Sequence, residues 1–437
     1  MENKKIYIET YGCQMNLSDT EIVSSILVNN GFHLSDKLDN ADVILLNTCS
    51  VRENAEKKIF QRLNHLKHYK KKKNNLIVGV IGCMAERLQD NLTSYNGLVN
   101  IVVGPDEYRK MPELLNNAFI GQKGIAIELG KVETYDDIIP LRTDGVSAWL
   151  SIMRGCNNFC SFCVVPYTRG RERSRPIKSI LQEVERLQSE GFKEITLLGQ
   201  NVNSYKCPET KSDFADLLIK ASDIAPNIRF RFTSSHPKDI SDKLIEAIAE
   251  KPNVCNHIHL AMQSGSNRIL KLMNRRYTIE HYLSRIEKIK NTIPDVSLTT
   301  DIIAGFPTET DDDHQATINA MKLIEYDGAY MFKYSPRENT KAYDFEDDVP
   351  EEIKLKRLNE IIEVQQEISK KLNKKEIGKL HKVLVERPSK KNENQWSGRT
   401  DTNKVVIFPK HQFVKPGDLI SVKIIDYTSA TLFGEII

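Results

Sequence analysis

About the first 130 residues alternate short apolar runs with longer segments of mixed polarity. Each run has the length of a buried strand and is too short for a buried helix. Strands that alternate with helical segments are typical of a doubly wound parallel sheet, so we predict an α/β domain of this type. The predicted strands cover residues 5–10, 41–46, 75–81 and 98–103.

A second series of strand-like runs begins near residue 147 and is interrupted by segments with helical periodicity. Six such βα units predict a partial (βα)6 barrel, smaller than the eight units of a closed barrel. The predicted strands are 149–153, 195–198, 228–233, 257–260, 297–304 and 329–334, and the predicted helices are 176–189, 213–222, 240–249, 279–291 and 312–325.

In the last part of the chain, the spacing of the apolar positions changes twice. Apolar positions at helical spacing between Pro350 and Gly378 predict one long connecting helix. From Lys379 the period is two, with a Pro416-Gly417 turn, which predicts a small all-β module. We therefore expect three domains, at residues 1–140, 141–372 and 373–437.

Composition restricts the class of protein. The 437 residues are 40% hydrophobic and 28% charged with a net charge of +3, which excludes disordered and collagen-like chains. The longest apolar run, 76–85, is shorter than the ~20 residues of a membrane span, and no signal peptide begins the chain. We expect a cytoplasmic protein without membrane contact, in which the eight cysteines serve metal or redox chemistry.

Three of these cysteines, Cys156, Cys160 and Cys163, follow the first strand of the second series. Three thiolates on a four-iron cluster would leave one iron open to a small molecule. A structural zinc knuckle is the alternative, with a distant fourth ligand for which Cys207 and Cys255 are available.

Another three cysteines, Cys13, Cys49 and Cys83, are separated by 36 and 34 residues, and each follows a predicted strand. Because the carboxyl ends of parallel strands lie on one edge of a sheet, we expect the three thiols to meet at one point. The alternative is that they are ordinary core cysteines.

The C-x3-C-x2-C spacing at the end of the first barrel strand resembles the signature of radical S-adenosylmethionine enzymes. This resemblance implies a [4Fe–4S] cluster whose open iron binds the amino and carboxylate groups of S-adenosylmethionine, which is then cleaved to a 5′-deoxyadenosyl radical. Such a cluster needs shielding from solvent, and we expect Phe162 to exclude water from it.

The order of segments is similar to that of the methylthiotransferases, in which a TRAM barrel follows the radical domain. Within this family, Tyr11-Gly-Cys-Gln-Met-Asn16 and the segments 158–170 and 174–176 resemble the MiaB branch. That branch attaches a methylthio group to the 2-position of N6-isopentenyladenosine at position 37 of tRNA. Alternatives are the branches that act on threonylcarbamoyladenosine or on a ribosomal protein, and a non-catalytic, metal-stabilised RNA-binding protein.

The family resemblance implies two [4Fe–4S] clusters, with the auxiliary one on Cys13, Cys49 and Cys83. Two molecules of S-adenosylmethionine are used, one to methylate a sulfur on the auxiliary cluster and one to make the radical. A flavodoxin or ferredoxin is implied as electron donor. Contacts to S-adenosylmethionine are expected from polar groups at later strand ends. These are Gln200, Asn203, Ser235 and Gln263, with Arg275, or equally Arg276, for the carboxylate.

Contacts to the tRNA anticodon stem-loop are expected from the segment 167–175, which contains four arginines. We predict that Tyr167, Arg169 and Arg175 bind the substrate, since guanidinium groups pair with phosphates and stack on bases. The alternative is a surface loop with internal Arg–Glu pairs. The C-terminal module has 11 Lys and Arg against 7 Asp and Glu from Lys375 onward, and is a second candidate RNA surface.

Overall fold

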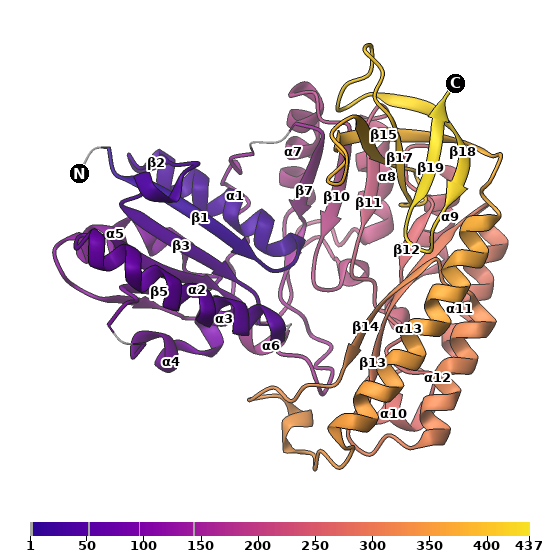
Figure 1. Cartoon of the computed structure of the whole chain (residues 1–437), viewed down its shortest axis with the longest axis horizontal. Helices are drawn as coiled ribbons and strands as arrows, with labels where there is room; N and C mark the ends of the chain where they lie inside the picture. The colour runs from indigo at the N-terminus through magenta and orange to yellow at the C-terminus, as the bar shows by residue number, and fades with distance from the viewer. Residues whose placement is uncertain (1–2, 51–52, 96, 143–144) are drawn as a thin grey trace.

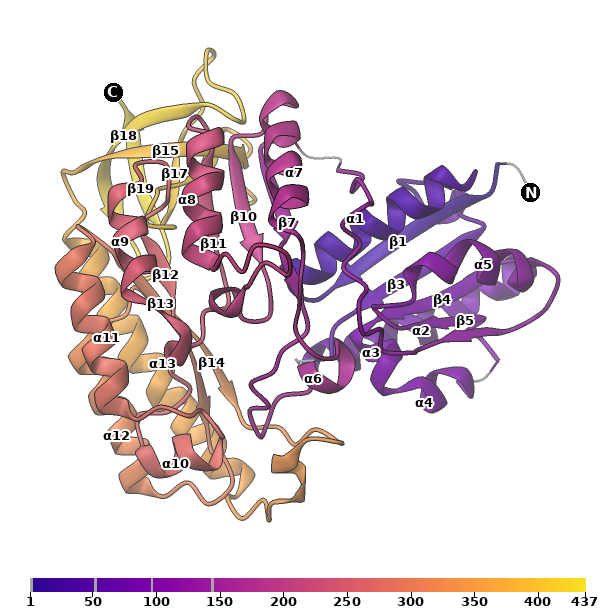
Figure 2. The same ribbon diagram turned by 180° about the vertical axis from the view of Figure 1, so that it is seen from behind.

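The computed structural model describes residues 3–50, 53–95, 97–142 and 145–437. Figures 1 and 2 show the molecule from opposite sides. An N-terminal domain built on β1–β6 lies beside a larger central domain built on β7–β14 and α13. A small C-terminal barrel packs on the end of the central domain away from the N-terminal sheet.

The N-terminal domain is the predicted doubly wound parallel sheet, with strand order β2-β1-β3-β4-β5-β6. Every residue of β3 and β4 is buried because helices cover both faces of the sheet. The strands are β1 (Lys5–Tyr11), β2 (His33–Leu34), β3 (Val43–Thr48), β4 (Ile77–Gly82), β5 (Ile101–Val103) and β6 (Gly124–Ala126). The α-helices are α1 (Gln14–Asn29), α2 (Glu53–Lys72), α3 (Cys83–Arg87), α4 (Gln89–Thr93) and α5 (Met111–Phe119).

The six predicted strands of the central domain form two parallel three-stranded sheets, β11-β10-β7 and β12-β13-β14. Isolated bridges from Phe230 to Val254 and from Ser235 to Leu260 join the sheets into an open partial barrel. The strands are β7 (Ser147–Ser151), β10 (Glu194–Leu198), β11 (Arg229–Phe232), β12 (His257–His259), β13 (Ser297–Ala304) and β14 (Gly328–Lys333). The helices are α7 (Ile177–Ser189), α8 (Phe214–Ile224), α9 (Asp242–Glu250), α10 (Asn267–Leu272), α11 (Ile279–Thr292) and α12 (Asp311–Ile324).

A short antiparallel pair, β8 (Met153–Arg154) and β9 (Arg173–Ser174), interrupts this alternation. The pair closes the base of the segment that carries Cys156, Cys160 and Cys163. Helix α6 (Val165–Thr168) lies within the segment and contacts α3 of the N-terminal domain. The cysteine segment therefore stands at the boundary between the two domains.

The predicted connecting helix is α13 (Glu351–Lys374), which packs along β13, β14 and α12. The C-terminal module is all-β, as its period of two predicted, and it forms the closed barrel that the family resemblance implied, with strand order β15-β16-β17-β19-β18. Arg231 of β11 donates hydrogen bonds to the carbonyls of Thr400 and Asp401, and these bonds attach the barrel to the central domain. Its strands are β15 (Leu380–Pro388), β16 (Gln395–Arg399), β17 (Val405–Pro409), β18 (Leu419–Tyr427) and β19 (Leu432–Ile436).

Candidate functional site

Cys13, Cys49 and Cys83 follow β1, β3 and β4, which are neighbours in the parallel sheet. A hydrogen bond with the Cys49 thiol lowers the pKa of Cys13 to about 6. A Cβ atom added at Gly12 would lie 2.8 Å from Cβ of Cys49, so these two turns approach closely. The Cys83 thiol lies within electrostatic range of Cys13. The structure therefore brings the three dispersed cysteines to one edge of the sheet.

Two buried asparagines fix these turns to one another. The side-chain amide of Asn16 donates to Oδ1 of Asn47 at 3.1 Å and to the Thr48 carbonyl at 3.2 Å, and Asn47 donates to the Asn16 carbonyl at 2.8 Å. Oδ1 of Asn16 accepts a hydrogen bond from the Cys13 backbone amide at 3.4 Å. This pair was not identified from the sequence. Its signal was an asparagine three residues after Cys13 and another two residues before Cys49.

Cys156, Cys160 and Cys163 lie in the turn after β8. Nη1 of Arg275 donates to Sγ of Cys160 at 3.2 Å, and the Cys163 amide donates to the Cys160 carbonyl at 3.0 Å. Burial raises the pKa of the Cys156 thiol to about 11 and also raises that of Cys163. Thiols with such pKa values become thiolates when a bound cation stabilises the charge, which is the chemistry of a metal ligand.

Within the described ranges, no group of three His, Cys, Asp or Glu side chains could hold a single metal ion. The ligands of one zinc ion converge on one point at about 2.3 Å. Three thiolates on a four-iron cluster instead bind three different irons. Two separate sets of three thiols fit this second arrangement. The other two cysteines, Cys207 and Cys255, are buried in the central domain.

Several polar atoms that follow the ends of β10, β11 and β12 are buried without a hydrogen-bond partner among the described residues. They are both amide atoms of Gln200, Nδ2 of Asn203, Oε1 of Gln263 and Nε2 of His236. The Ser235 hydroxyl donates to Oδ1 of Asn203 at 3.2 Å, and the Lys238 amide donates to Nδ1 of His236. Unpaired buried groups of this kind fit a polar ligand such as S-adenosylmethionine. His236 was not identified from the sequence.

The structure distinguishes the two arginines considered for the methionine carboxylate. Arg275 is 4% exposed and lies against Cys160, whereas Arg276 is exposed and has a φ of 56°. Phe162 packs on an apolar cluster with Met273, Phe306 and Tyr334 beside the same turn. Arg275 is therefore the one of the two arginines that contacts a thiol of the second cysteine set.

The predicted substrate residues divide into one exposed and two buried side chains. Tyr167 is 42% exposed and lines a pocket of about 680 Å³ together with residues 338–341, 343 and 344. Arg169 and Arg175 are 3% and 5% exposed and form ion pairs with Asp19 and Glu183. Their prediction as anticodon contacts is therefore corrected, because guanidinium groups paired inside the protein are not presented to RNA.

Comparisons with known proteins agree with this geometry. Three family profiles match the chain: an uncharacterized protein family (UPF0004) at residues 5–104, the Radical SAM superfamily at 150–321 and the TRAM domain at 374–437. The chain is 53% identical over 435 residues to the tRNA-2-methylthio-N(6)-dimethylallyladenosine synthase of Chloroherpeton thalassium, covering 99% of this chain and 96% of that protein. The chain belongs to this synthase family.

Further relatives with the same description come from Bacteroides fragilis, at 52% identity over 99% of this chain, and Porphyromonas gingivalis, at 49% over all of it. This chain covers 96% of the length of each relative. As a family member, the chain is a radical S-adenosylmethionine enzyme, which uses S-adenosylmethionine and a [4Fe–4S] cluster, and its TRAM domain and tRNA-modifying relatives support tRNA binding.

Among solved structures, the radical S-adenosylmethionine methyltransferase TsrM of Kitasatospora setae shares the fold. Its TM-score is 0.59 at 14% sequence identity, over 78% of this chain and 77% of that one. The cobalamin-dependent S-adenosylmethionine radical enzyme OxsB has a TM-score of 0.53 at 14% sequence identity, over 83% of this chain and 56% of that one. In the described part of the chain, no helix has the length and apolar character needed to cross a membrane.

Proposed function

We propose that this enzyme transfers a methylthio group to the 2-position of N6-isopentenyladenosine at position 37 of tRNA. The observation that carries the proposal is the pair of three-thiol sets on either side of one domain boundary, in a chain about half identical to named synthases over its full length. We assign one [4Fe–4S] cluster to Cys156, Cys160 and Cys163. A second, auxiliary cluster is assigned to Cys13, Cys49 and Cys83.

The clusters and S-adenosylmethionine supply electron transfer, radical formation and the sulfur that is transferred. The protein binds and orients these groups. Gln200, Asn203, Ser235 and Gln263 are proposed to hydrogen-bond the cosubstrate through the buried atoms described above, and Arg275 to pair with its carboxylate. Phe162 excludes water from the radical cluster, which strengthens these electrostatic contacts.

Recognition of the anticodon stem-loop is assigned to the pocket at Tyr167 and to the C-terminal barrel. An exposed aromatic ring beside the radical motif is suited to stacking on a base. The excess of Lys and Arg in the barrel supplies contacts to phosphates. We further propose a flavodoxin or ferredoxin as electron donor, a cytoplasmic location, and domain limits at residues 1–140, 141–372 and 373–437.

Iron analysis of anaerobically reconstituted protein tests the cofactor assignment. We expect about eight irons per chain for the wild type and about four for each triple Cys→Ala variant, because each variant keeps one [4Fe–4S] cluster. The spectra of the two variants should sum to that of the wild type. Zinc in place of iron would contradict the assignment and favour a metal-stabilised RNA-binding protein.

Nucleoside analysis tests the substrate assignment. Cells that lack the protein should accumulate N6-isopentenyladenosine and lose its 2-methylthio derivative, and both levels should return when the wild-type gene is restored. An unchanged level of the 2-methylthio derivative would contradict the proposal. Loss of methylthiolated threonylcarbamoyladenosine, or of a modification on a ribosomal protein, would assign the enzyme to one of the other branches.

A further inference from the structure

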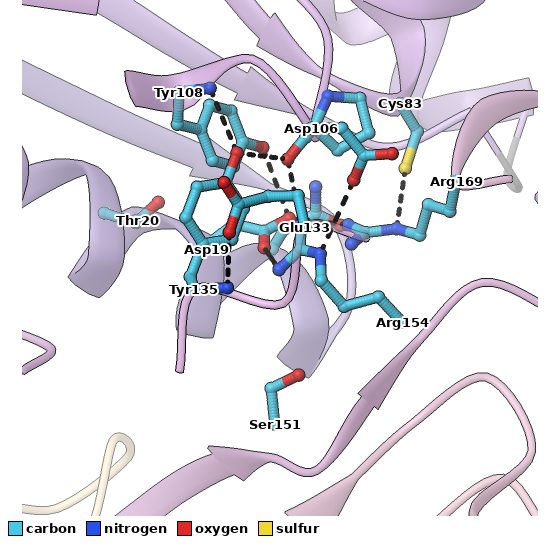
Figure 3. A network of polar contacts seen from close by, with 12 residues as sticks. Asp19, Thr20, Cys83, Asp106, Tyr108, Glu133, Tyr135, Ser151, Arg154 and Arg169 are labelled. Atoms are coloured by element: carbon cyan, nitrogen blue, oxygen red, sulfur yellow. Dashed lines mark hydrogen bonds and ion pairs between the residues drawn. The ribbon is translucent and has the colours of Figure 1, made fainter. Parts of the chain in front are cut away.

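Arg169, in the segment that follows the second cysteine set, contacts Cys83 of the first set across the domain boundary (Figure 3). It belongs to the central domain and lies six residues after Cys163. Its Nε donates to Sγ of Cys83 at 3.1 Å, and its Nη2 donates to Oδ2 of Asp19 in α1 at 2.7 Å. One side chain from the radical segment thus reaches a thiol of the other set, 86 residues away in the sequence.

Two further ion pairs at the same boundary enclose this contact. Arg154 lies 2.9 Å from Oδ1 of Asp19, and Arg173 lies 2.9 Å from Oδ1 of Asp106. Burial alone would raise the pKa of Asp19, but Arg154 and Arg169 outweigh burial and hold that pKa below its usual value. The carboxylate is therefore charged, and it fixes the two guanidinium groups that contact it.

The enclosed network carries an excess of positive charge. Three guanidinium groups, of Arg154, Arg169 and Arg173, face two carboxylates, of Asp19 and Asp106. Nη1 of Arg169 is buried and has no hydrogen-bond partner among the described residues. A donor thus remains for a further acceptor in this enclosure, and the local charge favours negatively charged sulfur.

We propose that Arg169 is a positioning residue of the auxiliary site: it hydrogen-bonds the Cys83 thiolate and holds this ligand in a fixed position relative to the radical segment. The inference rests on the proposed function, since it takes Cys83 as a ligand of the auxiliary cluster. Hydrogen bonds to ligand sulfurs stabilise the reduced, more negative cluster and raise its reduction potential. Arg169 therefore sets the potential of the auxiliary cluster in addition to joining the domains.

The matched comparison uses Arg169→Met, Arg169→Gln and Arg173→Met in the reconstituted full-length enzyme. Arg173 is also buried and also pairs across the boundary, with Asp106, but none of its described contacts is to sulfur. A redox titration followed by electron paramagnetic resonance gives the midpoint potential of each cluster. The iron content of each variant is measured in parallel.

We expect both Arg169 variants to lower the midpoint potential of the auxiliary cluster, with the larger shift in Arg169→Met because methionine donates no hydrogen bond. The potential of the radical cluster should not change. Arg173→Met should leave the radical potential unchanged and should lower the auxiliary potential by much less than Arg169→Met, because it removes one charge of the network but no hydrogen bond to sulfur. Selective loss of the auxiliary cluster from the Arg169 variants alone, leaving about four irons, would also support the proposal.

An unchanged auxiliary potential in fully loaded Arg169→Met would overturn the proposal, and so would an equal shift in Arg173→Met, because a purely structural ion pair would then explain the effect. These outcomes differ from failure of the proposed function, in which the wild type itself would show no auxiliary cluster.

Discussion

Gln200 is proposed to bind S-adenosylmethionine, and its side chain is buried in a way that this proposal explains. Both of its side-chain amide atoms are buried without a partner among the described residues. We expect Gln200→Leu to weaken binding of S-adenosylmethionine by about 1–3 kcal/mol, since a buried hydrogen-bonding group is lost. This corresponds to roughly 5-fold to 150-fold in Kd, measurable by equilibrium dialysis.

The free energy of unfolding without cosubstrate should be equal or higher in Gln200→Leu, because the unpaired amide is removed. Gln315→Leu on the exposed face of α12 is the control and should leave Kd unchanged. A wild-type Kd in Gln200→Leu would mean that the cosubstrate does not contact this side chain.

His236 should make stability depend on pH. Burial, and next the charge of Arg275, lower its pKa to about 2, whereas the unfolded chain has the ordinary value of about 6.5. The unfolded state therefore binds an additional proton as the pH falls below 6.5, and the free energy of unfolding decreases in that direction. From this residue we expect a loss of about 1.4 kcal/mol between pH 7.5 and 5.5.

Anaerobic urea unfolding of the wild type and of His236→Gln at these two pH values measures the effect. The variant should lose this part of the pH dependence, whereas His33→Gln, at an exposed histidine, should retain it. If His236→Gln and the wild type show the same pH dependence, His236 is not buried as a neutral side chain.

At the scale of elements, the turn between β8 and the cysteine segment depends on Gly155. Its φ is 77°, and a Cβ atom there would overlap the carbonyl oxygen of Arg171. We expect Gly155→Ala to lower the free energy of unfolding by about 1–3 kcal/mol through backbone strain. The same distortion should reduce radical-cluster loading, so that iron content falls toward half. Gly145→Ala, whose Cβ would lie in open space, should retain both properties.

The elements that could be predicted from the sequence are those that a continuous run of apolar residues specifies. Buried strands such as β3 and β4 are continuous apolar runs, and Cys13, Cys49 and Cys83 could be assigned to one sheet edge because each follows such a run. Strands β2 and β6 were missed because two or three residues are too short to show a period. For these edge strands, pairing with β1 and β5 decides the structure rather than the local sequence.

The role of Arg169 was not predictable because its partner is distant. Asp19 lies 150 residues earlier in the sequence, and nothing in the arginine-rich segment indicates a buried pair. An arginine cluster beside a catalytic motif has the same sequence pattern whether it faces RNA or an adjoining domain. Only the tertiary arrangement, in which α6 packs against α3, separates these cases.

On the scale of the whole molecule, the central domain contacts both neighbouring domains through arginines that are buried or largely buried. Arg154 and Arg169 pair with Asp19 of the N-terminal domain, and Arg229 and Arg231 donate to backbone carbonyls of the C-terminal barrel. Because these contacts are enclosed, salt screens them little, whereas RNA binding on exposed surfaces is strongly screened. Ionic strength should therefore change substrate affinity without separating the domains.

This difference leads to a prediction for the barrel. Lys390 and Lys391 are exposed in the turn between β15 and β16 and lie in the C-terminal module, which has the excess of Lys and Arg. If they contact phosphates, the double variant Lys390→Ala/Lys391→Ala should weaken binding of an anticodon stem-loop RNA. The slope of log K against log salt should become shallower by about 1–2, since each phosphate contact releases about one counterion.

Fluorescence anisotropy from 50 to 200 mM salt measures both quantities. The double variant Lys322→Ala/Lys356→Ala removes the same charge from exposed positions on the outer helices α12 and α13. A long-range effect of net charge would weaken RNA binding equally in both double variants. Direct phosphate contact at the barrel instead requires that only the Lys390/Lys391 variant change the slope. Equal slopes in the two double variants would mean that the RNA does not contact this turn.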